Sequence, residues 1–386
     1  MKEARLTLTR FLYFMRIAYF IGTLKEEDGV SRVLLRLATA MKEAGHESVI
    51  ITSHAENPER YPVPVLLLPG EQIFLYKDYY FPKPTSGKEV EKHLESFKPE
   101  LIHLHSPDTS AWLAITYAKH HNLPTVITHH TDFIRYLPYY HLTLFKPLLW
   151  MYLRKTYNRI TAVTTPSDVI TETLKQHGIK HAETLSNGVD IEKFNPRFRK
   201  NEWRNTIAGS PDTPIILFVG RLTWEKDLKT LIQTYDLLEK NDVRFRLAIV
   251  GDGPVYAELR KALPHATFLG HLIGEALSTA YASADIFLFP STTETFGNVT
   301  VEAMSSGAVP IVARAGGSIS IVQDEKNGFL VTPKDAQAFY EKVVFLIQNP
   351  DTREKIIKDA ILRAKAFAWP AIITKYINLY NKLITK

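Results

Sequence analysis

Cysteine is absent from the 386-residue sequence. Its absence excludes disulfide bonds and cysteine-ligated metal sites, and it fits a protein of a reducing compartment. The sequence also lacks an uncharged apolar run of about eighteen residues, so we expect no membrane-spanning helix. Residues 1–14 look like an appended extension rather than a signal peptide, because Arg16 interrupts the apolar stretch and no small-residue cleavage site follows. A cytoplasmic protein is therefore expected.

A large excess of one charge is missing as well, since the net charge is +6 at neutral pH. Residues 1–200 hold 26 lysines and arginines against 21 acidic residues, and the remainder is almost neutral. The balanced second half argues against a protein that wraps nucleic acid, whereas the first half could face an anionic surface.

Apolar runs alternate with helical patterns, which is typical of an α/β protein with parallel sheets covered on both faces. At 45% apolar residues the chain can bury two cores, so we predict two domains. They are residues 1–200 and 207–368, with the polar, proline-containing segment Phe194–Pro211 as linker. The predicted strands are Ile17–Ile21, Ser48–Thr52, Leu101–Leu104, Thr125–Thr128, Ile160–Thr164, Ile215–Val219, Arg246–Val250, Thr267–Leu269, Asp285–Phe289 and Val309–Ala313.

Two glutamates, Glu294 and Glu302, carry the most specific functional signal. Glu294 follows the predicted strand Asp285–Phe289 on a loop, and Gly297-Asn298 then opens a helix that ends near Gly307. Glu302 lies one turn inside that helix, on the same face as Asn298. The free backbone N–H groups of the helix start therefore lie between two carboxylates, an arrangement that suits a nucleoside diphosphate-sugar.

The chain resembles the retaining nucleotide-sugar glycosyltransferases of family 4, from roughly Met15 to Tyr380. The motifs that carry the resemblance are Glu-x7-Glu, Ala-Met-x-x-Gly, Pro-Ile-Val-Ala, Gly220-Arg221-Leu-Thr-Trp-Glu-Lys226, Gly251-Asp-Gly-Pro254, His129-His130-Thr-Asp132 and Ser186-Asn-Gly-Val-Asp190. The resemblance implies the GT-B fold, in which two Rossmann-like, doubly wound domains face each other across a cleft. It also implies that the first domain binds the acceptor and the second the donor, and that the C-terminal helix, residues 370–386, packs back onto the first domain.

Two cations sit at a predicted strand-to-helix crossover. Arg221 follows the strand Ile215–Val219, and Lys226 precedes the helix Leu228–Glu239. Such a pair can clamp a pyrophosphate, while the alternative is a structural ion pair and a solvated helix-start lysine. The resemblance assigns both to the donor diphosphate as the leaving group departs.

The resemblance assigns further donor contacts. Glu294 would hold hydroxyls of the donor sugar and Glu302 the ribose, since a carboxylate offers several acceptor lone pairs to a diol. The backbone N–H groups of Phe296, Gly297 and Asn298 would face phosphate. The other predicted donor-site glycines are Gly29, Gly220 and Gly251; for Gly251 a plain tight turn is the alternative.

One histidine of this family borders the reacting sugar, and His130 matches it best, with His129 as the competitor. Asp132 is either an acceptor-side group or a helix cap, and Tyr136 is assigned to the acceptor side. His103 and His105 alternate on a strand and could imitate a metal pair, but no third ligand is visible, so we interpret them as structural. An Asp-x-Asp motif is also missing, and we predict no metal site and no obligatory cofactor.

The segment Phe133–Arg159 contains five basic residues and no acidic one, among aromatics and leucines. This composition suits a segment lying on anionic lipid, while the alternative is a core helix beneath the cleft whose cations reach solvent. It also resembles the tyrosine-rich helix of sulfoquinovosyl- and mannosyl-glycolipid synthases of the family. The sequence therefore predicts transfer of a hexose from a GDP-mannose or UDP-glucose type donor to a glycolipid acceptor, on the inner face of the membrane. A soluble sugar or sugar-alcohol acceptor and a non-catalytic sugar-nucleotide-binding protein are the alternatives.

Overall fold

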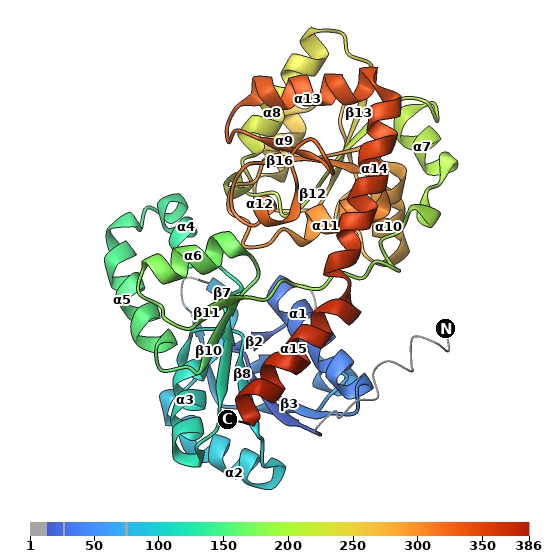
Figure 1. The fold of residues 1–386 in the computed structure, drawn as a ribbon. Helices are drawn as coiled ribbons and strands as arrows, with labels where there is room; N and C mark the ends of the chain where they lie inside the picture. Colours follow the sequence, from blue (N-terminus) through green and yellow to red (C-terminus); the bar gives the residue numbers. More distant parts are fainter. Residues whose placement is uncertain (1–13, 26–27, 74–75, 386) are drawn as a thin grey trace.

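A computed structural model describes residues 14–25, 28–73 and 76–385. Most of the predicted extension, residues 1–14, lies outside the described residues. The described chain forms two α/β domains, each built on a parallel sheet (Figure 1). The N-terminal sheet has the strand order β11-β10-β9-β8-β1-β3-β5. Its strands are β1 Arg16–Phe20, β3 Glu47–Thr52, β5 Val65–Leu67, β8 Leu101–Leu104, β9 Thr125–Thr128, β10 Ala162–Thr165 and β11 Ala182–Thr184.

The C-terminal sheet repeats the same topology with the order β14-β13-β12-β15-β16-β17. Its strands are β12 Ile215–Val219, β13 Arg246–Val250, β14 Thr267–Phe268, β15 Ile286–Phe289, β16 Val309–Ala313 and β17 Phe329–Val331. In each sheet the strand order reverses beside the first strand, β1 or β12. From β1 the chain adds β3 and β5 on one side and β8 to β11 on the other; from β12 it adds β13 and β14 on one side and β15 to β17 on the other. This is the doubly wound Rossmann order, so the predicted fold class is confirmed.

The crossovers between parallel strands are helical. The helices of the N-terminal domain are α1 Gly29–Glu43, α2 Gly87–Phe97, α3 Thr109–His121, α4 Phe133–Tyr136, α5 Lys146–Tyr157 and α6 Asp168–Gln176. Those that follow are α7 Asn201–Ala208, α8 Leu228–Lys240, α9 Tyr256–Ala262, α10 Gly274–Ser283, α11 Asn298–Ser306, α12 Ser318–Ile321, α13 Ala336–Gln348, α14 Pro350–Ala364 and α15 Trp369–Ile384. Short strands β2 Thr23–Leu24 and β4 His54–Ala55 pair with each other, and β6 Gly70–Ile73 pairs antiparallel with β7 Tyr76–Pro82.

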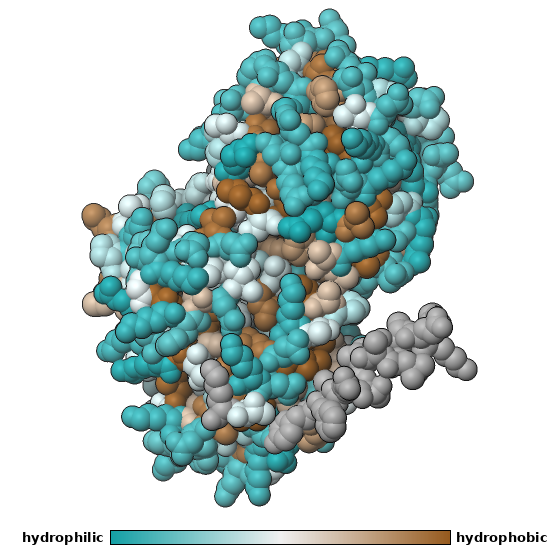
Figure 2. Space-filling model, in the orientation of Figure 1, coloured by the Kyte–Doolittle hydropathy of each residue, from teal (hydrophilic) through white to brown (hydrophobic). Residues whose placement is uncertain are grey.

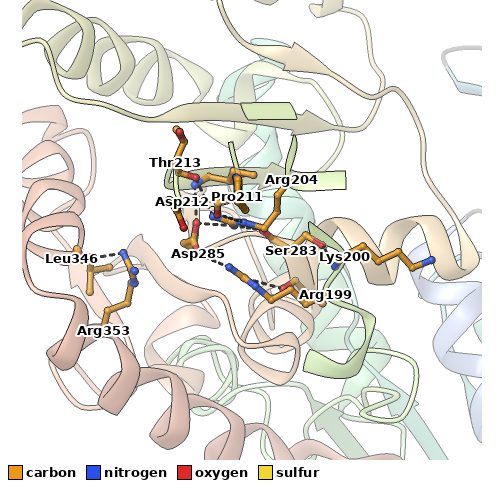
Figure 3. Close-up of polar contacts among 12 residues, drawn as sticks. Arg199, Lys200, Arg204, Pro211, Asp212, Thr213, Ser283, Asp285, Leu346 and Arg353 are labelled. Atoms are coloured by element: carbon orange, nitrogen blue, oxygen red, sulfur yellow. Dashed lines mark hydrogen bonds and ion pairs between the residues drawn. The ribbon is translucent and has the colours of Figure 1, made fainter. Parts of the chain in front are cut away.

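The segment Phe194–Pro211 differs from the linker that the sequence predicts, because it contains helix α7. Arg204 of α7 is 3% exposed at its side chain and pairs with Asp285 at 2.9 Å between Nη1 and Oδ2 (Figure 3). Its guanidinium also donates to the carbonyl oxygens of Pro211, Thr213 and Ser283. A buried charge is tolerated when it is paired and hydrogen-bonded in this way, and α7 is thereby fixed to the C-terminal sheet.

Helix α15 leaves the C-terminal domain and crosses back over the N-terminal sheet (Figure 1). Its buried side chains share one apolar cluster with β1, β3, β8, β9 and α1; those of α15 are Ile372, Ile373, Tyr376, Ile377, Leu379, Tyr380 and Leu383. The backbone N–H of Val189, at the start of the interdomain connection, donates to the carbonyl oxygen of Phe367, just before α15. The chain thus passes between the domains twice.

The segment Phe133–Arg159 is neither one helix nor fully buried. It consists of α4, two single 3-10 turns (η4 Leu137–Tyr140 and η5 Thr143–Phe145) and α5. It enters the core at its two ends, through Ile134 near its start and through Leu153 and Tyr157 near its end. Between these ends apolar side chains are exposed, with Leu144 at 94%. Apolar groups are visible on the surface in Figure 2. The long core helix is therefore the wrong alternative. No described helix is long and apolar enough to cross a membrane.

Candidate active site

The candidate residues lie where the two domains meet. In a doubly wound sheet, ligands bind beyond the carboxyl ends of the strands, where the strand order reverses. That point lies beside β1 and β8 in one sheet and beside β12 and β15 in the other. The loop after β15 touches the loops after β9 and β10, because Thr295 Oγ1 donates to His130 O at 2.6 Å and Ser167 Oγ donates to Thr295 O at 2.7 Å.

Lys226 and Glu294 form the centre of the C-terminal half of the site. Lys226 ends the turn η7 Trp224–Lys226, and its Nζ lies 2.5 Å from Glu294 Oε1. Ser291 Oγ donates to the same carboxylate oxygen at 2.9 Å. Both charged side chains are only about 15% exposed. The loop of Glu294 is held from behind, where Gly317 N donates to Glu294 O at 2.8 Å.

Arg221 is exposed and follows β12, next to Gly220. Gly251 follows the adjacent strand β13 with φ +134°. A Cβ at Gly251 would lie 1.9 Å from Gly220 O, so only glycine permits the two loops to approach this closely. The structure therefore brings Gly220, Arg221 and Gly251 together.

Helix α11 begins as the sequence predicts, with Gly297 in the left-handed region at φ +105° and Asn298 as its first residue. The side chain of Phe296 is buried and packs edge-to-face on Phe367, which leaves its backbone for the site. Beside Gly297, Thr300 Oγ1 and Ser318 Oγ are buried without a hydrogen-bond partner among the described residues. Hydroxyls of this kind next to the positive end of a helix can serve an anionic ligand.

Glu302 lies inside α11 and accepts a hydrogen bond from Tyr281 OH at 2.8 Å. Burial raises the pKa of Glu302, and the Tyr281 hydroxyl, Arg32 and Lys193 act in the opposite direction. Arg32 comes from α1 of the other domain. Sequence analysis missed both Tyr281 and Arg32, because neither stands in a motif and both reach Glu302 from distant elements.

The two adjacent histidines face different surroundings. His129 is 2% exposed, and its Nδ1 lies 2.9 Å from Tyr157 OH within the N-terminal core. His130 is half-buried at the domain boundary, and its Nε2 lies 2.8 Å from His105 Nδ1. Burial lowers the pKa of His129 to about 4 and that of His130 to about 3, and the neighbouring His129 adds to the effect at His130. Both rings are therefore neutral at physiological pH.

The other N-terminal candidates are Asp132, Tyr136 and Gly29, and the structure places them differently. Asp132 does not cap α4 and instead pairs with Arg135, at 3.0 Å between Oδ2 and Nε. Arg135 continues across the boundary and donates from Nη1 to Thr292 O at 3.0 Å. The side chain of Tyr136 lies outside the described part of the chain. Gly29 starts α1 behind the cap Asp28, and α1 also carries Arg32 towards Glu302.

Within the described residues, histidine, aspartate and glutamate side chains form no group of three or more that could hold a metal ion. His103 binds instead to Tyr380 OH and Thr128 Oγ1, at 2.6 and 2.8 Å. The cations and backbone amides described above are the groups that can bind a diphosphate here.

Comparison with known families matches both halves of the chain. Residues 28–193 match the model described as Glycosyltransferase Family 4, and residues 199–363 match the model described as Glycosyl transferases group 1. The sequence is also 30% identical to a GDP-mannose-dependent alpha-mannosyltransferase of Mycolicibacterium smegmatis, over 96% of this chain and 98% of the relative. The chain belongs to the family 4 glycosyltransferases.

This glycosyltransferase is also similar to a plant relative and to a solved bacterial structure. It is 35% identical to the sulfoquinovosyl transferase SQD2 of Arabidopsis thaliana, over 88% of this chain and 67% of the relative. Its fold is that of HepE from Anabaena, solved in complex with UDP and glucose, with a TM-score of 0.76 at 20% identity, covering 96% of this chain and all of that one. The GT-B architecture is thereby confirmed.

Proposed function

We propose that this glycosyltransferase is a retaining enzyme that moves a hexose from a nucleoside diphosphate-sugar to a hydroxyl of a membrane glycolipid. The observation that carries the proposal is the contact between Lys226 and Glu294. Glu294 lies on the loop that precedes α11, and Thr295 of the same loop is hydrogen-bonded to His130. A cation for the diphosphate, a carboxylate for sugar hydroxyls and a neutral histidine thus converge from two domains.

In the proposed reaction, the bond between the sugar C1 and the diphosphate oxygen breaks as the acceptor oxygen bonds to C1 on the same face. The acceptor proton moves to the departing diphosphate. Lys226, Arg221 and the N–H groups at the start of α11 stabilise the charge that develops on the leaving group. Glu294 exchanges its contact with Lys226 for the sugar hydroxyls when the donor binds.

The donor class is tested by incubating the protein with GDP-mannose, UDP-glucose and UDP-sulfoquinovose and following release of the nucleoside diphosphate. Diacylglycerol glycolipids, a simple sugar and a sugar alcohol serve as acceptors in parallel. We expect one donor to react with a lipid acceptor, and NMR of the product to show the anomeric configuration of the donor. An inverted product would contradict retention, and reaction with the soluble acceptors alone would contradict the lipid assignment.

A glycolipid acceptor is supported by the exposed apolar side chains within residues 142–151. It is also supported by similarity to an alpha-monoglucosyldiacylglycerol synthase of Streptococcus pneumoniae, 24% identical over 91% of this chain and 83% of the relative. The alternative, a non-catalytic sugar-nucleotide-binding protein, would bind a donor without releasing its nucleoside diphosphate. The presence of Arg221, Lys226, Glu294 and Glu302 together favours the enzyme.

The proposed chemistry needs no metal, because protein cations and amides bind the diphosphate. We therefore predict that turnover survives EDTA, measured as nucleoside diphosphate release before and after chelation. Complete loss of activity that magnesium or manganese restores would contradict this prediction.

A further inference from the structure

His105 lies directly behind His130, away from the donor half of the site. It follows β8, while His130 follows the adjacent strand β9, so the two rings meet at the carboxyl edge of the sheet. His105 Nδ1 and His130 Nε2 are 2.8 Å apart, the ring centroids are 5.1 Å apart and the ring planes differ by 17°. The centroid separation is close to the nitrogen separation plus the radii of two imidazole rings. The two nitrogens therefore lie nearly on the line between the centroids, which is the lone-pair direction of a strong hydrogen bond.

The ring of His105 has little freedom to move. It is 2% exposed and packs against His103 at 4.3 Å and against the edge of Tyr19 at 5.7 Å between centroids. His103 is itself fixed, because Tyr380 of α15 and Thr128 of β9 occupy both of its ring nitrogens. A ring held in this way can dictate the state of the ring that it contacts.

One proton is shared between the facing nitrogens, since a neutral imidazole carries one N–H and one acceptor. The other nitrogen of His105, Nε2, is buried without a hydrogen-bond partner among the described residues. Placing an N–H there would bury an unmatched donor and would also force His130 to donate from Nε2. Protonation of His105 at Nδ1 uses its one N–H in the hydrogen bond to His130 and leaves only an acceptor unpaired at Nε2, which favours this tautomer.

On the His130 ring, Nδ1 makes no hydrogen bond to the described residues and is not among their buried unpaired atoms. This nitrogen is therefore accessible to solvent, on a ring that lies at the domain boundary.

We propose that His105 is a positioning residue that donates from Nδ1 to His130 Nε2 and so keeps His130 in the Nδ1–H tautomer. His130 then presents a neutral N–H donor to a hydroxyl of the bound sugar, a step that rests on the proposed function. The tautomer itself does not depend on any substrate.

The test begins with the ligand-free wild-type protein, labelled with nitrogen-15 at histidine. Long-range proton–nitrogen correlation spectra report which ring nitrogen is protonated, and loss of one signal set in His130→Ala assigns His130. We expect His130 to be protonated at Nδ1. Protonation at Nε2, or an equal mixture, would overturn the proposal without any variant of His105 and whatever the enzyme's activity.

Two variants test the consequence. In Asn, the side-chain amide nitrogen can occupy the place of Nδ1, so His105→Asn should preserve the His130 tautomer and most of the turnover. His105→Leu removes the donor, and we expect mixed tautomers and a fall in kcat of about tenfold to a hundredfold, the range for partners that orient a histidine. His46→Leu is the control, because His46 is a buried histidine outside the site whose ring nitrogens have no partner among the described residues.

A folded His105→Leu protein with unchanged tautomer and kcat would also overturn the proposal. If no donor is turned over by the wild type, the proposed function fails, but the tautomer measurement still decides the role of His105. The two failures are therefore distinguishable.

Discussion

At the scale of single residues, the proposed chemistry depends on the contact between Lys226 and Glu294. Lys226→Ala and Glu294→Ala should each lower kcat at least about a hundredfold, because a charge-assisted contact that tightens in the transition state contributes about 2.7–4 kcal/mol. Steady-state release of nucleoside diphosphate measures the effect.

Lys240→Ala is the matched control, since Lys240 is exposed at the far end of α8. Circular dichroism and thermal unfolding establish that each variant is folded. A folded Lys226→Ala or Glu294→Ala enzyme with near-normal kcat would remove that residue from the proposed site.

Thr295 makes two of the hydrogen bonds that join the two domains at the site. Its hydroxyl binds His130 O, and its carbonyl accepts from Ser167 Oγ. Thr295→Val keeps the shape but loses the hydroxyl. A net contribution of about 1 kcal/mol predicts a roughly fivefold shift towards separated domains.

The shift should appear as a larger radius of gyration in small-angle X-ray scattering and as a KM for donor raised about fivefold. Thr295→Ser keeps the donor and should resemble the wild type. Unchanged scattering and an unchanged KM in Thr295→Val would show that the hydroxyl does not hold the domains together.

At the scale of elements, α7 depends on the buried ion pair between Arg204 and Asp285. Arg204→Met removes the buried cation and leaves Asp285 only the half-exposed Arg199, at 3.2 Å between Oδ1 and Nη2, so we expect a loss of up to about 3–5 kcal/mol of unfolding free energy. Urea denaturation followed by circular dichroism measures the loss. Arg197→Met is the control, because its pair with Glu192 is exposed on both sides and contributes at most about 1 kcal/mol. Equal effects of the two substitutions would contradict the role assigned to α7.

The segment Phe133–Arg159 is the second element with a measurable role. Of its five basic residues, Arg135 turns into the domain boundary, which leaves Lys146, Arg154, Lys155 and Arg159 for an anionic surface. Each basic residue near such a surface contributes about 1 kcal/mol, and salt screens the attraction. We therefore predict co-sedimentation with anionic vesicles at low salt and release as ionic strength rises.

Arg154→Glu with Lys155→Glu should abolish that binding. Lys88→Glu with Lys92→Glu on α2 changes the charge equally elsewhere in the same domain and should retain it. Absence of wild-type binding to anionic and to neutral vesicles would show that the exposed side chains serve another purpose, and would favour a soluble acceptor.

Elements differ in how well the sequence predicts them. The strands β8, β9, β12, β13 and β16 have the predicted bounds, because fully buried parallel strands are short apolar runs between polar loops. The edge strands β5 and β11 and the hairpin β6–β7 were not predicted, since partly exposed strands lack such a run. The edge strand β17 is buried but only three residues long, and it was not predicted either. Helix α7 was mistaken for linker because the burial of Arg204 depends on Asp285, a partner 81 positions away.

The residues of the candidate site also differ in how well the sequence predicts them. Motifs identified Glu294, Lys226 and His130 because these residues stand at predicted strand ends. His105 was interpreted as structural, because its contact with His130 arises only from the adjacency of β8 and β9. Contacts between separate elements carry no local signal in one sequence.

At the scale of the whole molecule, α15 determines when the core of the N-terminal domain can be completed. Its side chains fill the cluster that contains Ile17, Leu101 and Val126, and Tyr380 holds His103 behind His105. Yet α15 follows the entire C-terminal domain in the chain, and synthesis proceeds from the N-terminus. A nascent chain can thus complete its second domain while the first still exposes an apolar surface. Premature termination anywhere before residue 369 would leave that surface uncovered, a ready signal by which chaperones and proteases could recognise an unfinished enzyme.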